Sequence, residues 1–300
     1  MVSDALKQLH ALIEKRNQCF VKGQIDFLCH ESDLQCIERR RERDRRRGAK
    51  TVKSTVTGTI IRRQQFENML QIEYVVKYEY LIDLRGHLYI EEHRQHRRAL
   101  FVDALIAEDK EISIPPFAED NNQSGKSQVR LFLNQNRQRM YDRREAVRYA
   151  ERWWDDYNPQ YIKFENNCTN FISQCLRAGG APMTGMPNRS KGWWFQQKNW
   201  SYTWAVANSF RWYLSGATGG LRGEERQSPI ELVPGDVICY DFNGDGRWQH
   251  TTIVVAKDAN GEPLVNAQTT NSRMRFWAYE DSTAWTDKIQ YKFFHLPDRF

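Results

Sequence analysis

The spacing of hydrophobic residues predicts two helices at the start of the chain. Leu6, Leu9 and Ile13 recur at the spacing of one helix face, and charged residues fill many of the positions between them. A second, shorter helix is expected from about Asp33 to Gly48, because a glycine readily takes the backbone conformation that ends a helix.

The pattern then changes to the two-residue period of strands. Arg85 and Gly86 are the expected turn between the second and third strands. Helices followed by long antiparallel strands predict an α+β domain, with a curved sheet wrapped on a helix. This order of elements is similar to the cystatin-like cone, a likeness of fold alone. The expected strands are rich in β-branched and aromatic residues and span residues 52–61, 69–84 and 87–106.

The second half of the chain differs in composition and predicts a separate domain. All ten tryptophans lie between Trp153 and Trp285. The polar segment 118–128 lacks periodicity and contains Gly125, which is typical of a linker. We therefore expect an N-terminal α+β accessory domain at 1–120, a linker at 121–140 and a second α+β domain at 141–300.

The net charge of +6 is concentrated in residues 39–50, which carry an excess of six basic residues. This run, Arg39 to Lys50, could bind an anionic polymer, or it could be a solvated end of the second helix. No aromatic residue is interleaved with the arginines, so nucleic-acid binding is not expected.

The chain shows no segment that would span a membrane and no signal peptide at its N-terminus. Its six cysteines have neither a CxxC pair nor metal-ligand spacing, which favours a reducing compartment. We expect a cytoplasmic protein, or an extracellular one if a leader has been removed.

Two helices open the second domain, and the second of them carries a candidate nucleophile. The first is expected from Tyr141 to Asp156, and the second begins at or near Cys168. Cys168, Phe171 and Cys175 share the inward face of that helix. Cys168 also lies in the first turn, where the helix dipole and free N–H groups favour a thiolate. Cys175 lies two turns further along and is expected in the core.

A candidate base lies downstream, where residues 232–270 predict three strands joined by turns. His250 begins the second of these strands. An antiparallel sheet packed on the preceding helix would bring His250 to Cys168. The third strand places Asn266 and Gln268 on one face, and either amide could orient the imidazole.

These residues carry a resemblance to a known family. The stretches YDRREAVRYAERW, NPQYIKFENNCTNFISQCLRAGGAPM, KGWWFQQKNWSYTW, LVPGDVICYDFNGDGRWQHTTIVV and PLVNAQTT resemble the bacterial "putative amidase domain" family, from about Tyr141 to Leu296. That family looks like a branch of the papain-like cysteine hydrolases related to CHAP domains. The resemblance implies Cys168 as nucleophile, His250 as general base and Gln268 at a third position that is usually histidine.

In this family an acid commonly precedes each of the two catalytic residues. Here these two preceding positions hold amides, Asn167 and Gln249. The resemblance therefore implies one of two functions. The first is a cysteine amidase or peptidase that acts on a peptide or a peptidoglycan-like substrate, with no cofactor. The second is a catalytically degenerate domain that binds such a ligand. Asn167, Trp193 and Trp194 are the residues expected to contact it, although burial in the core accounts for most tryptophans.

We expect no metal site, although two patterns bear on one. Residues Asp241 to Gly246 match the opening of a calcium loop, but Thr252 replaces its bidentate glutamate and excludes an EF-hand. The same residues are typical of a hairpin turn, and calcium binding there stays open. His87, His93 and His96 lie in a charged run and are expected at the surface.

Overall fold

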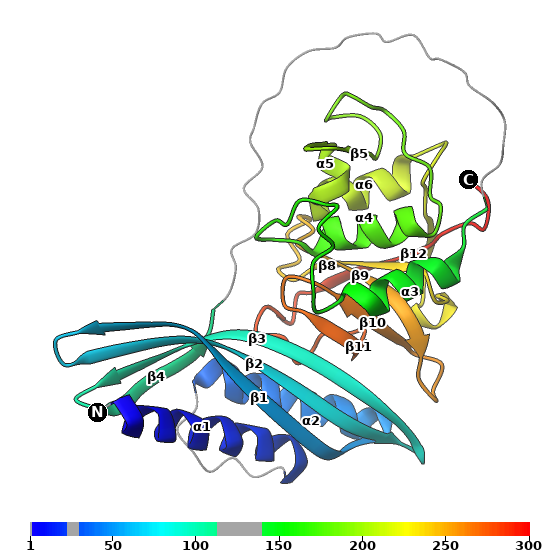
Figure 1. The fold of residues 1–300 in the computed structure, drawn as a ribbon. Coiled ribbons are helices and arrows are strands. Elements are labelled where there is room, and N and C mark those ends of the chain that lie inside the picture. The colour runs from blue at the N-terminus through cyan, green and yellow to red at the C-terminus, as the bar shows by residue number, and fades with distance from the viewer. Residues whose placement is uncertain (1, 23–29, 113–139) are drawn as a thin grey trace.

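The computed structural model of the protein describes residues 2–22, 30–112 and 140–300. We call residues 2–112 the N-terminal part and residues 140–300 the C-terminal part. Figure 1 shows helices and a broad antiparallel sheet in both, which confirms the predicted α+β class. The linker predicted at 121–140 falls on residues 113–139, outside the described ranges, except for its last residue. Within the described ranges, no helix is long and apolar enough to cross a membrane.

The N-terminal part is a four-stranded antiparallel sheet with two helices on one face (Figure 1). Every second residue of its central strand β2 is buried, and these residues pack on Ala5, Leu9 and Ile13 of the first helix. The predicted period of two thus separates a face toward the helices from a more polar face. The elements are α1 (Val2–Lys22), α2 (Glu31–Arg47), β1 (Ala49–Phe66), β2 (Met69–Leu84), β3 (His87–Val102) and β4 (Leu105–Glu111).

The predicted helix end at Gly48 and the predicted turn at Arg85 and Gly86 are confirmed, whereas one predicted strand forms two strands. Gly48 ends α2 with φ of 73°, a conformation that glycine adopts without steric cost. Arg85 and Gly86 connect β2 and β3, with φ of 55° and 87°. Residues 87–106 do not form one strand, because Asp103 and Ala104 also take positive φ and turn the chain into β4.

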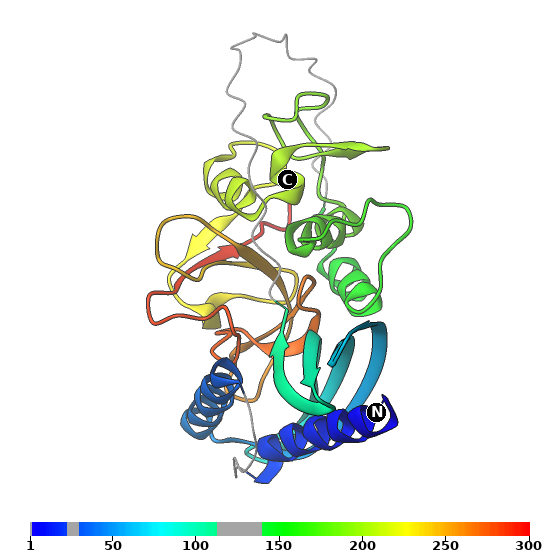
Figure 2. The same cartoon turned by 90° about the vertical axis from the view of Figure 1, so that its left-hand side faces the viewer.

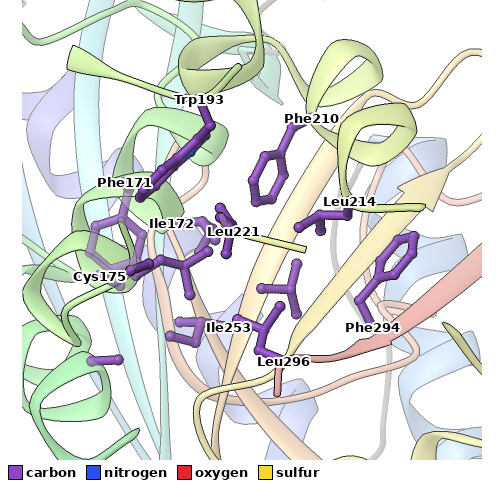
Figure 3. Close-up of a cluster of buried hydrophobic side chains, with 14 of the residues drawn as sticks. Phe171, Ile172, Cys175, Trp193, Phe210, Leu214, Leu221, Ile253, Phe294 and Leu296 are labelled. Atoms are coloured by element: carbon purple, nitrogen blue, oxygen red, sulfur yellow. The ribbon is translucent and has the colours of Figure 1, made fainter. Parts of the chain in front are cut away.

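The C-terminal part packs helices on one face of a second group of strands. The predicted helices are confirmed at α3 (Arg143–Trp153) and α4 (Cys168–Ala178). Figure 3 shows their core, in which Phe171, Ile172 and Cys175 of α4 face Ile253 of the sheet. The remaining elements are β5 (Phe195–Gln196), β6 (Asn199–Trp200), α5 (Tyr202–Ala205), α6 (Ala207–Gly216), β7 (Glu224–Arg226), η1 (Pro229–Glu231), β8 (Val237–Asp241), β9 (His250–Lys257), β10 (Pro263–Ala267), β11 (Ser272–Phe276) and β12 (Gln290–His295).

One sheet runs through both parts. Strand β3 pairs with β11 through His93 opposite Ser272 and Glu92 opposite Arg273, and the strand order is β1-β2-β3-β11-β10-β9-β8-β12-β7. Figure 2 shows the N-terminal strands running up against the C-terminal strands. Arg273 also forms ion pairs with Glu92 and with Glu151 of α3. The two parts are therefore joined by backbone pairing as well as by side chains.

The arginine run of α2 lies against the C-terminal part. Arg40 bonds to Asp281 at 3.0 Å and to Glu91 at 2.7 Å, and Arg43 lies 3.3 Å from Asp281. Arg47 bonds to Asp258 at 2.9 Å. Burial alone would raise the pKa of Asp281, but Arg275, Arg43 and Arg40 hold that pKa well below its ordinary value.

These contacts correct the expectation of a solvated helix end. Arg40, Arg43 and Arg47 are 2%, 1% and 7% exposed, so three of the guanidinium groups are engaged by carboxylates of the protein itself. Arg45 and Arg46 on the same helix keep side chains that are 77% and 53% exposed. The sequence pattern could not distinguish the buried arginines of α2 from the exposed ones, because most of the acids that pair with the buried arginines lie far along the chain.

The buried ion cluster around Asp281 makes a prediction about stability. Arg43→Ala should lower the free energy of unfolding by about 3–5 kcal/mol, because Asp44 and Asp281 would lose a buried partner. Arg45→Ala on the same helix is the matched control and should change stability little. Urea unfolding followed by circular dichroism measures both. Equal effects of the two substitutions would contradict the importance of the cluster.

Candidate active site

A cavity of about 470 Å³ brings the predicted nucleophile and base together. Cys168, the first residue of α4, and His250, the first residue of β9, both line it. The loop after β11 contributes Tyr279 and Thr283, and the end of β4 contributes Glu111. The N-terminal part therefore forms one wall of the cavity that holds Cys168.

The thiol of Cys168 lies at the N-terminus of α4, as the sequence predicts. Its Sγ lies 3.7 Å from Thr169 Oγ1 and 4.0 Å from the carbonyl oxygen of Gln249. The residue is 5% exposed. The backbone N–H groups of Cys168 and Asn167 both donate to Thr269 Oγ1, at 3.1 and 2.9 Å. One hydroxyl thus covers the start of the helix.

Thr269 reaches the start of α4 through an unusual backbone conformation. Its φ is 90°, far from the values that a β-branched residue normally adopts. Thr269 follows the end of β10 and lines the cavity. Such backbone conformations cluster at functional sites because the surrounding structure has to enforce them. The strained turn delivers the hydroxyl to the helix start.

The imidazole of His250 lies among aromatic rings. Its Nε2 is 3.2 Å from the hydroxyl of Tyr279, and the rings of Tyr240 and Phe242 lie beside it. Burial, and to a lesser extent the charge of Arg275, lower the pKa of His250 to about 3. The imidazole is therefore neutral at pH 7. Within the described residues, no hydrogen bond joins it to Cys168 Sγ.

The two amides predicted to orient the imidazole lie elsewhere. Gln268 accepts a hydrogen bond from Asn167 and donates to the carbonyl oxygen of Trp153, the last residue of α3, at 2.5 Å. Asn266 donates to Glu151 of α3 at 2.7 Å. The structure thus places both amides toward α3, and it is Tyr279 that contacts His250. The sequence pattern gave no signal for Tyr279, because it lies outside the predicted strands.

The three residues expected to contact a ligand are interior. Asn167 is 2% exposed and accepts hydrogen bonds from the side chain of Asn170 at 2.9 Å and the N–H of Phe164 at 3.0 Å. Trp193 and Trp194 are 0% exposed, and the indole N–H of Trp193 donates to Ser173 at 2.9 Å. None of the three lines the cavity. Asn167 instead positions the turn before Cys168.

The candidate calcium loop uses its first acid to close a turn. The carboxylate of Asp241 accepts hydrogen bonds from the backbone N–H groups of Asn243, Gly244 and Gly246, at 3.2, 2.9 and 2.7 Å. Both of its oxygens are thus engaged by the loop itself. This is the role of a carboxylate in a tight turn.

His93 corrects the expectation of surface histidines, because it is 7% exposed. It lies with Glu91 and Asp281, and one ligand atom of each falls within 4.8 Å of the others. Arg40 pairs with both carboxylates, and Arg43 and Arg275 pair with Asp281. Cationic guanidinium groups already occupy this cluster and would repel a metal ion.

Comparison with known proteins places this site in context. The family described as "Putative amidase domain" matches residues 140–294. The "Uncharacterized protein YhbB" of Bacillus subtilis (strain 168) is 48% identical over 271 residues, which cover 89% of this chain and 87% of that protein. The "Uncharacterized protein YjcM" of the same organism is 28% identical over 211 residues, or 67% of this chain and 46% of that protein. No solved structure matches the chain significantly.

The lowered pKa of His250 predicts how stability depends on pH. Between pH 6.5 and about 3 the unfolded chain binds a proton at this residue and the folded chain does not, so stability falls as pH falls. Going from pH 7 to pH 5 should cost about 2 kcal/mol through His250. Urea unfolding of His250→Asn at both pH values should lack this contribution, whereas the exposed-residue control His87→Asn should retain it. An unchanged pH dependence in His250→Asn would contradict the prediction.

Proposed function

Because the chain belongs to the putative amidase domain family, we propose that it hydrolyses amide bonds with Cys168 as nucleophile and His250 as base. Family membership itself indicates amide hydrolysis in general. The observation that carries the finer proposal is the shared cavity. It joins the thiol at the start of α4 to an imidazole more than eighty positions later in the chain.

The first step is transfer of the thiol proton. A neutral imidazole can accept it, and burial keeps His250 neutral at physiological pH. Because the same burial also weakens the imidazole as a base, the transfer depends on the imidazolium pairing with the new thiolate. Since Tyr279 engages Nε2, Nδ1 is the ring nitrogen left for the thiol. The imidazole has to approach Cys168 when substrate binds, because catalytic hydrogen bonds are often incomplete before that. The resulting thiolate is stabilised by the N-terminus of α4.

The thiolate then attacks the carbonyl carbon, and the carbonyl oxygen becomes an oxyanion. The N–H of Cys168 is already engaged by Thr269, so that N–H is not a ready donor. The hydroxyl of Thr269 accepts two N–H bonds and can donate its own proton into the cavity. We assign Thr269 the role of oxyanion donor.

The intermediate collapses when the imidazolium returns its proton to the leaving amine, and the C–N bond breaks. A thioester on Cys168 remains. His250 next removes a proton from water, and the hydroxide attacks the thioester carbonyl. The C–S bond breaks, the acid product leaves, and the thiolate takes back the proton. The cycle consumes one water and needs no cofactor.

The arrangement of a cysteine helix on an antiparallel sheet that carries a histidine supports a papain-like fold for the C-terminal part. The four-stranded antiparallel sheet of the N-terminal part, with its two helices, supports a resemblance to the cystatin-like cone. We propose a peptide as the substrate, with bacterial wall peptides as the first candidates.

A second function is favoured by one observation. In the described structure His250 bonds to Tyr279 and has no hydrogen bond to the thiol. This geometry also suits a domain that binds a peptide in the cavity without cleaving it. The two functions differ in turnover, which the next experiment measures.

Labelling and hydrolysis together test the Cys168 proposal. Iodoacetamide should alkylate Cys168, as read by peptide mass spectrometry, and Cys168→Ala should abolish hydrolysis of a peptide-amide panel. His250→Asn should slow hydrolysis by about 10²–10⁴-fold through loss of the base. Cys36→Ala, at a partly exposed cysteine of α2, is the control and should keep full activity. Peptide binding without turnover in the unaltered protein would instead establish the binding function.

The role of Thr269 is tested by an isosteric pair. Thr269→Val removes the hydroxyl and should lower kcat by about 10²-fold with a small change in KM, as for loss of an oxyanion donor. Thr269→Ser keeps the hydroxyl and should retain most activity. A loss shared equally by both variants would exclude the oxyanion role and indicate that the methyl group matters.

A further inference from the structure

We propose that Glu111 binds a positively charged group of the substrate beside Cys168, so that the N-terminal part selects what the C-terminal part cleaves. This inference rests on the proposed function. It starts from the composition of the cavity wall. Glu111 ends β4, yet it lines the same cavity as Cys168 and His250.

The position of Glu111 is fixed from both sides. Backbone pairing holds Glu111 opposite Arg97 of β3, and the N–H of Ile112 donates to the carbonyl oxygen of His96 at 2.7 Å. The carboxylate accepts a hydrogen bond from Thr283 Oγ1 at 3.3 Å. Thr283 belongs to the loop of the C-terminal part that lines the cavity. The carboxylate thus stands where the two parts meet around the site.

The charge balance of the cavity favours a cation. Among its described lining residues, Glu111 is the one acid, and Arg275 is the one lysine or arginine. Arg275 is already neutralised, because its guanidinium makes two hydrogen bonds to Asp281, at 3.1 and 2.8 Å. The polar contacts of the thiol are both uncharged, namely the hydroxyl of Thr169 and the backbone carbonyl oxygen of Gln249. Glu111 is therefore the acid that the cavity offers to a ligand.

The surroundings of Glu111 disfavour an unpaired negative charge, which a cationic ligand would stabilise. Burial raises the pKa of Glu111, and the charge of Asp33 adds to that rise, while Arg97 and Arg275 oppose it. A carboxylate that has lost part of its hydration gains more from a charged donor than from a neutral donor. The ligand chemistry that fits is an ammonium group on the peptide, within reach of the amide attacked by Cys168.

Charged thiol reagents test this without knowledge of the substrate. Aminoethyl, sulfonatoethyl and methyl methanethiosulfonates carry a positive, a negative and no charge. Their rates of reaction at Cys168 are measured on the full chain by peptide mass spectrometry, relative to N-acetylcysteine amide. The cationic reagent should be favoured over the anionic one by about fivefold or more, and added salt should reduce this ratio.

Substitutions then assign the preference to Glu111. Glu111→Gln should lower the cation-to-anion ratio to near one and leave the neutral reagent within about twofold of its original rate, and Glu111→Lys should invert the ratio. Glu108→Gln is the matched control, since Glu108 lies on the same strand outside the cavity. It should keep the preference.

The outcomes separate this inference from the proposed function. Labelling of Cys168 with no charge preference in the unaltered protein overturns the inference alone, as does a preference that survives Glu111→Gln. If Glu111→Lys fails to fold, Glu111→Gln and the Glu108→Gln control still decide whether the preference depends on Glu111. Failure of all three reagents to label Cys168 removes the proposed nucleophile, and this inference with it.

Discussion

The contact between the two parts of the protein depends on the carboxylate of Asp281, which pairs with arginines from both. Arg40 and Arg43 reach it from α2, and Arg275 reaches it from β11. Asp281 lies in the loop that also carries Tyr279, which contacts His250, and Thr283, which contacts Glu111. A buried carboxylate is unfavourable without cationic partners, and two of the three arginines that pair with Asp281 come from the N-terminal part, so docking of that part stabilises the loop. The ion cluster thereby shapes the cavity as well as the interface.

The site differs from a cysteine–histidine ion pair in its electrostatics. Aromatic rings surround His250, and burial keeps its imidazole neutral. The thiol rests against a hydroxyl and a carbonyl oxygen. In the reaction that we propose, charge develops at this site when the thiol proton moves to His250. The donor that we propose for the oxyanion is the hydroxyl of Thr269, because it already holds the N–H groups at the start of α4.

The sequence predicted the elements well and the connections between distant side chains poorly. The start of α4 at Cys168 and the burial of Cys175 follow from local spacing, and the structure confirms both. Local spacing could not predict the positions of residues that depend on tertiary contacts. Trp193 was expected at the cleft but is a core residue. Its residue type could not decide between the two places, because indole rings pack in an interior as readily as they line a cleft. Glu111 and Tyr279 lie in unremarkable stretches, and long-range packing alone brings them to the cavity.

The pairing of β3 with β11 has an evolutionary consequence. Domains that are joined by a flexible tether can be exchanged between genes, since each keeps its own complete surface. Here a recombination that removed the N-terminal part would uncover the edge of β11 and leave unpaired backbone groups open to another strand. Selection should therefore pass the two parts on together, as one heritable unit.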